Sequence, residues 1–402
     1  MKILIDCRFW GPKDTGLGRY TKNLVENLLA IDNKNNYCLI FRQKADYEKL
    51  CNNLPALKIN RLFDYKILNV VHYSLKEQLI FPWFISQLKP DLIHFPHFNL
   101  PFFWQGKYIV TIHDLIKHQS KGMATTTRHP WIYFLKYAGY KLVIKQAIKT
   151  AKKIIVPSEA VKKEMITTYK VSQEKIAVIY EGVDNQYQIS QPKAGRSRAE
   201  NIKYKISEKV LQKYKIKKPF VIYTGNVYPH KNIRRLILAV KMVNSVRVNC
   251  HQTPIKLVIV CGRSIFLNRL RKEIKELKAE SFVLLPGFIS DNKLKFLYSK
   301  AELFITPSLM EGFGLPALEA MATGCLVICS NIPVFKEIYD KAAIYFYPEN
   351  VEDIKEKIIN TLNLSLKMKE QIRKEGYKQV KQYSWRKCAE ETLKTYEGCF
   401  SL

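Results

Sequence analysis

The sequence predicts an α/β fold with two parallel sheets. Short apolar runs of strand length alternate with amphipathic helical patterns along the chain, which is typical of parallel sheets covered by helices on both faces. The chain has 402 residues, more than one hydrophobic core usually supports, and 47% of them are hydrophobic. We therefore expect two domains, with a ligand bound in a cleft between them at the carboxyl ends of both sets of strands.

The first domain is predicted at residues 1–184. Leu17, Tyr20, Leu24 and Leu28 recur at the spacing of one helical face and indicate a helix after the first strand. Six strand candidates share short runs of branched and aromatic residues, and they lie at 2–7, 36–41, 91–95, 108–112, 153–157 and 176–180.

A polar stretch at residues 185–218 lacks long apolar runs and is interpreted as a linker with one short helix. The second domain is predicted at residues 219–384. It contains a second series of strand candidates, at 220–224, 256–261, 282–286, 303–307, 326–330 and 343–347.

The charge balance favours anionic partners. Lys and Arg number 66 against 35 Asp and Glu, a formal net charge of +31. Nucleic acid, anionic lipid and phosphorylated substrates would all suit such a chain, and a general lysine bias in composition would give the same value.

Cysteine usage and hydropathy exclude several protein classes. Nine cysteines without a C-x-x-C pair fit neither a disulfide framework nor a zinc site, and they are interpreted as reduced core thiols. No apolar stretch approaches the roughly 18 to 20 residues that span a bilayer, and the N-terminus does not resemble a secretion signal. We expect a cytoplasmic protein.

The segment PSLMEGFGLPALEAMATG, residues 307–324, is the most informative motif. Gly312 and Gly314 lead to Pro316, which suits a first helical turn, and the free N–H groups of such a turn suit a phosphate. Glu311 and Glu319 flank this anion site. Because carboxylates repel phosphate, we expect them to accept hydrogen bonds from sugar hydroxyls.

A second phosphate signal lies in YTGNVYPHKN, residues 223–232. A predicted strand ends at Gly225, and a helix is predicted to begin after Asn232. Lys231 would then be presented beside a helix N-terminus, where an ammonium can stabilise the charge that develops on a pyrophosphate. Taken alone, a lysine in this position is usually a solvated surface charge.

Two weaker signals lie in the first domain. Gly16 and Gly18 are expected between the first strand and the first helix, where backbone can approach a ligand closely. His113 follows another strand candidate, at a position from which a side chain could reach the cleft. His94 and His97 follow no zinc spacing, and no metal site is predicted.

Together these segments resemble glycosyltransferase family 4, whose members have the GT-B fold of two Rossmann-like domains. The resemblance covers nearly the whole chain in the expected order, and Glu311 with Glu319, separated by seven residues, is its most specific part. It rests on EGFGLPALE, GNVYPHKN, TIHDL, GLGRY, VPSEAVKKEM, EGVD and SNIPVFKEI. The chain is most similar to the mannosyltransferases of bacterial polysaccharide assembly.

The resemblance implies a retaining enzyme that moves a hexose from a nucleotide sugar, GDP-mannose by preference, to a glycan or lipid-linked acceptor without metal or other cofactor. It implies that the donor phosphate takes the acceptor proton. It also implies that the helix at residues 385–402 returns to the first domain.

The resemblance assigns a role to each matching residue. Glu311 and the backbone of Gly312, Phe313, Gly314 and Leu315 would hold the donor sugar and phosphate, with Glu319 on the ribose. Lys231, beside Asn226, would hold the pyrophosphate and Gly16 would line it. His113 would lie near the transferred sugar, and Gly262 and Phe288 near the base.

The phosphate loop departs from the family pattern. Relatives commonly carry an arginine where this chain has Asn226 or His230. His230 would supply positive charge only when protonated, and Arg263 is a candidate to compensate.

Three alternatives remain open at this point. They are a transferase with a UDP-sugar donor, a nucleotide-sugar epimerase with the same fold, and a basic nucleic-acid-binding protein. The last is motivated by charge alone, since no nucleic-acid-binding module is evident in the sequence. We expect no nucleic acid as a partner.

The acceptor is expected near the aromatic segment HFPHFNLPFFW, which could equally be core. Lys141, Lys145, Lys149 and Lys152 fall on one helical face, so the protein could associate with the inner face of an anionic membrane. An ordinary solvated face would look the same.

Overall fold

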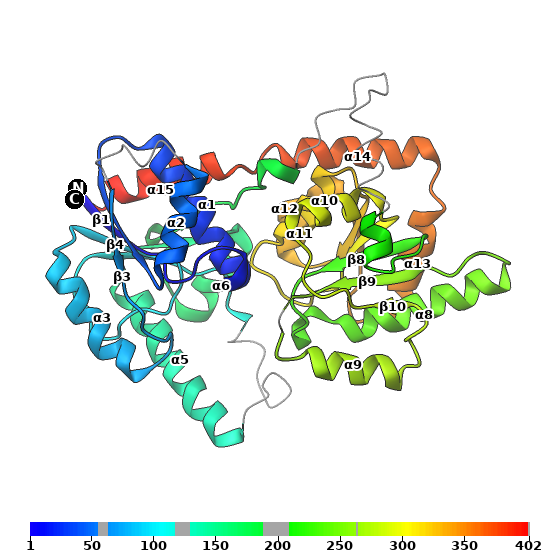
Figure 1. Cartoon of the computed structure of the whole chain (residues 1–402), viewed down its shortest axis with the longest axis horizontal. Helices are drawn as coiled ribbons and strands as arrows, with labels where there is room; N and C mark the ends of the chain where they lie inside the picture. Colours follow the sequence, from blue (N-terminus) through cyan, green and yellow to red (C-terminus); the bar gives the residue numbers. More distant parts are fainter. Residues whose placement is uncertain (55–62, 117–128, 188–208, 263, 401–402) are drawn as a thin grey trace. The chain divides into compact units, whose positions relative to one another are not determined.

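The computed structural model describes residues 1–54, 63–116, 129–187, 209–262 and 264–400. The chain divides into two compact units (Figure 1). Unit 1 comprises Met1–Leu115, Arg128–Gly182 and Tyr383–Leu402, and unit 2 is formed chiefly by Val183–Gln382. Most of the predicted linker, residues 188–208, lies outside the described residues, and residues 209–213 are helical.

Unit 1 contains a seven-stranded parallel sheet in the order β3-β2-β1-β4-β5-β6-β7. Its order reverses between β1 and β4, which is where doubly wound sheets usually bind ligands. The strands are β1 Lys2–Asp6, β2 Asn36–Phe41, β3 Phe63–Ile67, β4 Leu92–Phe95, β5 Tyr108–Thr111, β6 Lys153–Val156 and β7 Ile176–Val178.

Helices cover both faces of this sheet (Figure 1). α1 and α15 pack against each other on one face, with the rings of Tyr20 and Trp385 6.0 Å apart. α3, α5 and α6 share one buried cluster with the strands on the other face. The helices are α1 Thr15–Ile31, α2 Lys44–Asn53, α3 Leu75–Leu88, α5 Pro130–Thr150, α6 Glu159–Tyr169 and α15 Trp385–Glu397.

Unit 2 contains a six-stranded parallel sheet in the order β10-β9-β8-β11-β12-β13, which reverses between β8 and β11. All six strands lie at positions that the sequence predicts. They are β8 Phe220–Thr224, β9 Lys256–Val260, β10 Val283–Leu284, β11 Leu303–Thr306, β12 Val327–Ser330 and β13 Ile344–Phe346.

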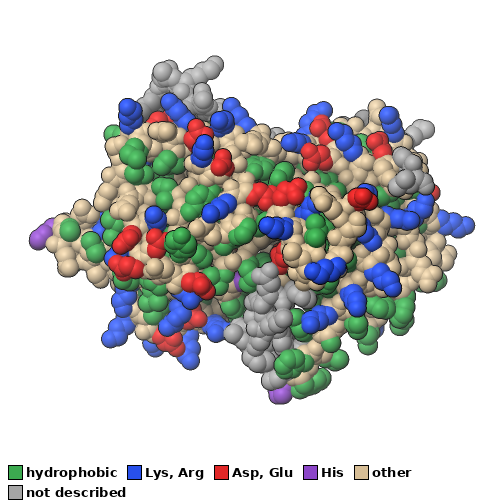
Figure 2. Space-filling view, turned by 180° about the vertical axis from the view of Figure 1, so that it is seen from behind, with side chains coloured by type: hydrophobic (Ala, Val, Ile, Leu, Met, Phe, Trp, Pro, Cys, Tyr) green, Lys and Arg blue, Asp and Glu red, His purple; other side chains and the backbone are tan. Residues whose placement is uncertain are grey.

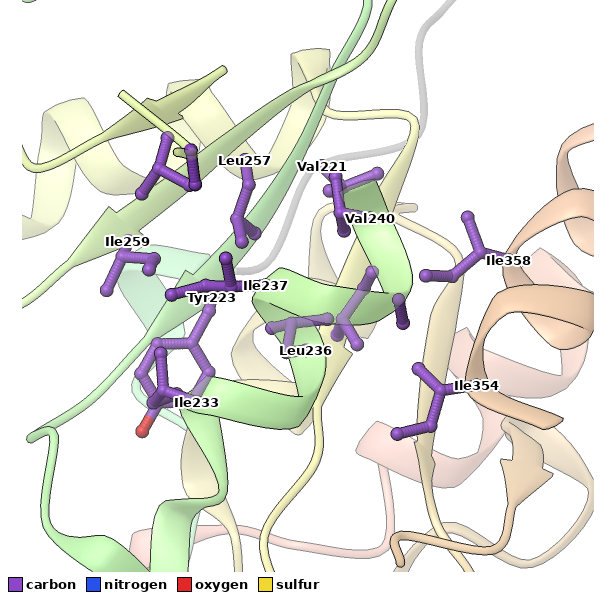
Figure 3. Packing of buried hydrophobic residues seen from close by; sticks show 14 of the residues in the cluster. Val221, Tyr223, Ile233, Leu236, Ile237, Val240, Leu257, Ile259, Ile354 and Ile358 are labelled. Carbon is purple, nitrogen blue, oxygen red and sulfur yellow. The ribbon is translucent and has the colours of Figure 1, made fainter. Parts of the chain in front are cut away.

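The core of unit 2 explains the apolar face of its first helix, α8. Leu236, Ile237 and Val240 point from α8 toward the sheet residues Val221 and Leu257 (Figure 3). Each of these side chains is at most 1% exposed. The helices are α8 Ile233–Asn249, α9 Leu267–Glu276, α10 Asp291–Lys300, α11 Leu315–Ala322, α12 Pro333–Tyr339, α13 Val351–Leu362 and α14 Leu366–Val380.

The cysteines and the apolar character of the helices can be compared with the sequence predictions of buried reduced thiols and of no membrane-spanning stretch. All nine cysteines are free thiols and seven are buried, whereas Cys250 is exposed and Cys399 is half-buried, so these two are not core residues. In the described parts of the chain, no helix combines the length and the apolar character needed to cross a bilayer.

Candidate functional site

The loop after β8 is built to turn sharply. Gly225 has φ 149°, and the hydroxyl of Tyr223 donates a hydrogen bond to the carbonyl of Asn226 at 2.6 Å. The short 3-10 helix η6, Pro229–Lys231, follows, and Asn232 adopts the left-handed conformation (φ 59°) just before α8. The Asn232 amide donates to the carbonyls of Pro307 (3.0 Å) and Pro348 (2.7 Å), which holds this loop against the chain after β11.

The two predicted donor motifs meet at Lys231 and Glu311. Lys231 Nζ lies 2.5 Å from Glu311 Oε1, and Ser308 Oγ donates to the same oxygen at 2.7 Å. The two charged side chains are only 14% and 15% exposed. Shielding from water strengthens the attraction between the two charges, so Glu311 holds Lys231 in place beside the carboxyl end of β8, where it is not a freely solvated charge.

The helix α11 begins beside this pair. Gly314 has φ 100° and precedes the helix, and its carbonyl accepts a hydrogen bond from the Tyr339 hydroxyl at 2.6 Å. A Cβ atom at this position would lie 2.0 Å from that hydroxyl and 2.8 Å from Phe335, so only glycine fits. With Pro316 in the first turn, the backbone N–H of Leu315 lies at the positive end of the helix dipole, where an anion can bind.

The remaining predicted residues of unit 2 fall into two sets. Phe313 and Glu319 are buried, at 4% and 5% exposure, the latter within α11. Gly262 follows β9 and Phe288 follows β10. The two residues lie side by side, as a Cβ on Gly262 would be 3.7 Å from the Phe288 ring. Phe288 is 64% exposed, so its ring is available for stacking on a planar group.

His230 is neutral at physiological pH. Burial, with a smaller effect of the Lys231 charge, lowers its pKa to about 4, and the charge of Glu311 opposes this shift. It cannot replace the missing arginine as a positive charge in the ligand-free site. Arg263, the predicted substitute, lies outside the described residues.

His113 of unit 1 lies two residues after β5, and both of its ring nitrogens have partners. Nδ1 lies 3.1 Å from Glu181 Oε1 and Nε2 lies 3.0 Å from the Pro96 carbonyl. Burial lowers its pKa, but the hydrogen bond and charge of Glu181, together with the Pro96 carbonyl and the charge of Asp114, raise the pKa above its ordinary value. The histidine is therefore oriented by a carboxylate.

The glycines of the first motif are not in a loop. α1 begins at Thr15, so Gly16 and Gly18 lie in its first turn and the predicted position before the helix is wrong. A Cβ on Gly18 would lie 2.1 Å from the Gly11 carbonyl, which explains that glycine by packing. A Cβ on Gly16 would meet no atom within 4 Å, so its backbone faces open space.

The aromatic segment at the end of β4, predicted either to bind the acceptor or to belong to the core, contains both buried and exposed residues. Phe95, Phe98 and Leu100 are buried in the core of unit 1, whereas Phe103 is exposed. Of the two histidines, His94 is bonded through both ring nitrogens to Tyr396 and Thr111. No group of three or more His, Cys, Asp or Glu residues could hold a metal ion within the described segments.

Sequence reasoning missed a buried ion-pair cluster at the same edge of unit 1. Arg8 Nη2 lies 2.8 Å from both Asp6 Oδ2 and Glu77 Oε1, and the Asn99 amide donates to Glu77 at 2.9 Å. A signal for this cluster was present in the sequence, since Glu77 is the single acidic residue of a mainly apolar helix, where a carboxylate is usually paired.

Comparisons with known proteins match this architecture. Residues 15–187 match the family model described as Glycosyltransferase Family 4, and residues 206–379 match that of Glycosyl transferases group 1. The O-antigen chain mannosyltransferase RfbU of Salmonella typhimurium is 30% identical over 262 residues, 60% of this chain and 65% of that relative's length. The O-antigen chain mannosyltransferase B of Escherichia coli is 26% identical and covers 95% of this chain and 96% of its own.

Solved structures share the fold over almost the full chain. HepE of Anabaena, in complex with UDP and glucose, has a TM-score of 0.71 at 16% identity, over 99% of this chain and 100% of that one. A glycosyltransferase from Rickettsia africae has a TM-score of 0.67 at 19% identity and covers 99% and 98% of the two chains. The fold is thus the GT-B fold that the sequence predicts, and the chain belongs to the glycosyltransferases with a Family 4 domain followed by a group 1 domain.

Proposed function

We propose that this glycosyltransferase transfers mannose from GDP-mannose, with retention of configuration, to a glycan or lipid-linked acceptor. The observation that carries the proposal is the 2.5 Å contact between Lys231 and Glu311 beside the glycine-led start of α11. An ammonium, a carboxylate and the N-terminal end of a helix side by side match a pyrophosphate that is joined to a sugar.

Each group has a distinct task in this proposal. Lys231 has three N–H donors, so it can keep its bond to Glu311 while donating another to the pyrophosphate. The N–H groups from Gly312 to Leu315 bind the phosphate on the other side. Glu311 accepts hydrogen bonds from sugar hydroxyls, and Glu319 from the ribose.

Lys231 also provides most of the stabilisation of the leaving group. Negative charge accumulates on the pyrophosphate as the glycosidic bond breaks, and a preorganised cation stabilises this charge more in the transition state than in the ground state. The departing phosphate takes the acceptor proton, so neither a metal ion nor a protein base is required. From unit 1, we assign Gly16 to the pyrophosphate and His113 to the transferred sugar.

The donor is assigned to mannose because the two relatives named above are mannosyltransferases. A UDP-sugar donor is the second candidate, because HepE was solved with UDP and glucose. Phe288 beside Gly262 would accept either base by stacking, so the described contacts do not choose between them.

Thermal stability measured against GDP, UDP, ADP, their sugar conjugates, NAD and a short DNA duplex tests the proposal. A ligand that binds only the folded state stabilises it by about 2.7 kcal/mol at a hundredfold excess over Kd. We expect GDP and GDP-mannose to raise the melting temperature most, with the same shift in EDTA.

Without acceptor, GDP-mannose should be hydrolysed slowly and not epimerised. Stabilisation by UDP alone would move the assignment to a UDP-sugar transferase. Stabilisation by DNA but by no nucleotide would overturn the proposal.

A further inference from the structure

The exposed hydrophobic residues of unit 1 are concentrated in one part of the chain. Among the described residues of this unit, every large exposed hydrophobic side chain lies between residues 67 and 142. None comes from α1, α2, α6 or α15. Eight belong to α3 and α5, and they are Leu75, Leu79, Ile80, Trp83, Trp131, Phe134, Leu135 and Leu142. In Figure 2, hydrophobic side chains mix with Lys and Arg at the lower right, over these helices.

The two helices lie on the same face of the sheet. Phe81 and Ile85 of α3 and Ile144 and Ala147 of α5 are fully buried in one cluster with the strands. Their outer sides therefore form one surface, which we call the α3–α5 face.

The polarity of α3 is the reverse of that of an ordinary surface helix. Its only carboxylate, Glu77, points inward to Arg8, whereas Leu79 and Trp83 point outward at 74% and 63% exposure. Leaving such residues in water is unfavourable, so exposed apolar residues gathered on one face usually mark an interaction site.

The charges on this face have one sign. Glu77 is the single acidic residue of the two helices, and it is buried. The lysines are all exposed, and they are Lys76, Lys136, Lys141, Lys145 and Lys149. Of the predicted basic stripe, Lys152 lies just beyond the end of α5. A second copy of the chain would bring lysine against lysine, which is unfavourable.

We propose that the α3–α5 face docks unit 1 onto an anionic lipid surface, with its apolar and tryptophan side chains inserted among the lipids. Lysines beside an apolar helix face are the pattern by which interfacial helices bind anionic bilayers. Tryptophan is favoured at the level of the lipid headgroups. The inference rests on the proposed function in one respect: membrane docking would bring the enzyme to a lipid-linked acceptor.

Vesicle flotation with the full chain tests the proposal. We expect binding to phosphatidylcholine vesicles that contain phosphatidylglycerol, and weaker binding to phosphatidylcholine alone or at high salt. Leu79→Glu with Trp83→Glu, or Leu135→Glu with Leu142→Glu, should each weaken binding at least tenfold. The matched control, Leu366→Glu with Met368→Glu on α14, adds the same charge at exposed sites of unit 2 and should leave binding unchanged.

The electrostatic and inserted parts of the interaction can be measured separately. Lys141→Ala with Lys145→Ala should weaken binding to anionic vesicles about tenfold and leave binding to neutral vesicles unchanged. Brominated lipids should quench tryptophan fluorescence, and Trp83→Phe with Trp131→Phe should remove most of the quenching, because Trp10 and Trp385 are buried and Trp104 is only partly exposed.

Several results would overturn the proposal. These are equal binding to neutral and anionic vesicles, unchanged binding by the folded glutamate variants, or sedimentation showing that those variants dissolve a dimer of the wild-type chain. The melting-temperature shift with nucleotide reports the donor site independently. Absence of lipid binding by the wild-type chain, together with a normal nucleotide shift, would therefore overturn this inference and leave the proposed function in place.

Discussion

In unit 2 the chain leaves β8 and β11 through glycine-containing loops that expose backbone N–H groups and one lysine–glutamate pair. In unit 1 the chain leaves β1 and β5 through side chains that already bind one another, such as Arg8 with Asp6 and His113 with Glu181. Both sheets reverse their strand order near this edge. The same topology thus gives unit 2 an ion pair beside the N-terminal end of a helix, and it gives unit 1 an ion pair and a hydrogen-bonded histidine without such a helix end described beside them.

The largest effects should follow from breaking the pair in unit 2. Lys231→Ala and Glu311→Ala should each lower kcat/KM by about 100- to 1000-fold, because the lost contacts stabilise the transition state most. Lys241→Ala, an exposed lysine of the neighbouring α8, is the control and should keep wild-type turnover. Near-normal turnover in either folded site variant would remove the assignment.

Gly314→Ala should destabilise the protein by about 2 to 4 kcal/mol, because the left-handed φ and the clash with Tyr339 both oppose a Cβ. Gly139→Ala is the matched control within α5. Its Cβ meets no atom within 4 Å, so it should leave stability unchanged or raise it by up to about 1 kcal/mol. Denaturant unfolding measures both, and equal stability of the two variants would contradict the packing described for Gly314.

The pKa values of two histidines, one in each unit, should be shifted in opposite directions. The folded-state pKa of His113 is raised, so its contribution to stability is complete below about pH 6.5 and is lost as the pH rises through the folded pKa. The pKa of His230 is lowered to about 4, so its contribution is present above about pH 6.5 and is lost as the pH falls toward 4.

NMR titration of the imidazole signals measures both values. Glu181→Gln should lower the pKa of His113 and leave that of His230 unchanged, because the carboxylate charge that favours the imidazolium is removed. An unchanged His113 titration in this variant would show that Glu181 does not set its charge.

Most of the fold was predictable because parallel strands are buried on both faces and give continuous apolar runs. β3 was missed, since FDYKI carries Asp64 and Lys66 and lies at the edge of the sheet, where its side chains stay partly exposed. The start of α1 was also misplaced, because Gly16 and Gly18 are typical of loops and only tertiary packing shows why Gly18 is tolerated in a helix.

The candidate site was predictable only residue by residue. The motifs around Lys231 and Glu311 could be recognised separately, but the two residues lie 80 positions apart and their contact depends on the order of β8 and β11. The neutral state of His230 depends on burial, which no local pattern encodes. The pairing of Arg8 with Glu77 depends in the same way on how α3 crosses the sheet.

The return of α15 to unit 1 has a consequence for the order of events during synthesis. Tyr383–Leu402 belong to unit 1 but leave the ribosome after Val183–Gln382, the main part of unit 2. Until they emerge, α1 lacks its partner helix and His94 lacks the Tyr396 hydroxyl, which lies 2.6 Å from its ring in the complete unit. The unit that begins first is thus completed last, and in the interval its unfinished face is exposed to chaperones and to other nascent chains.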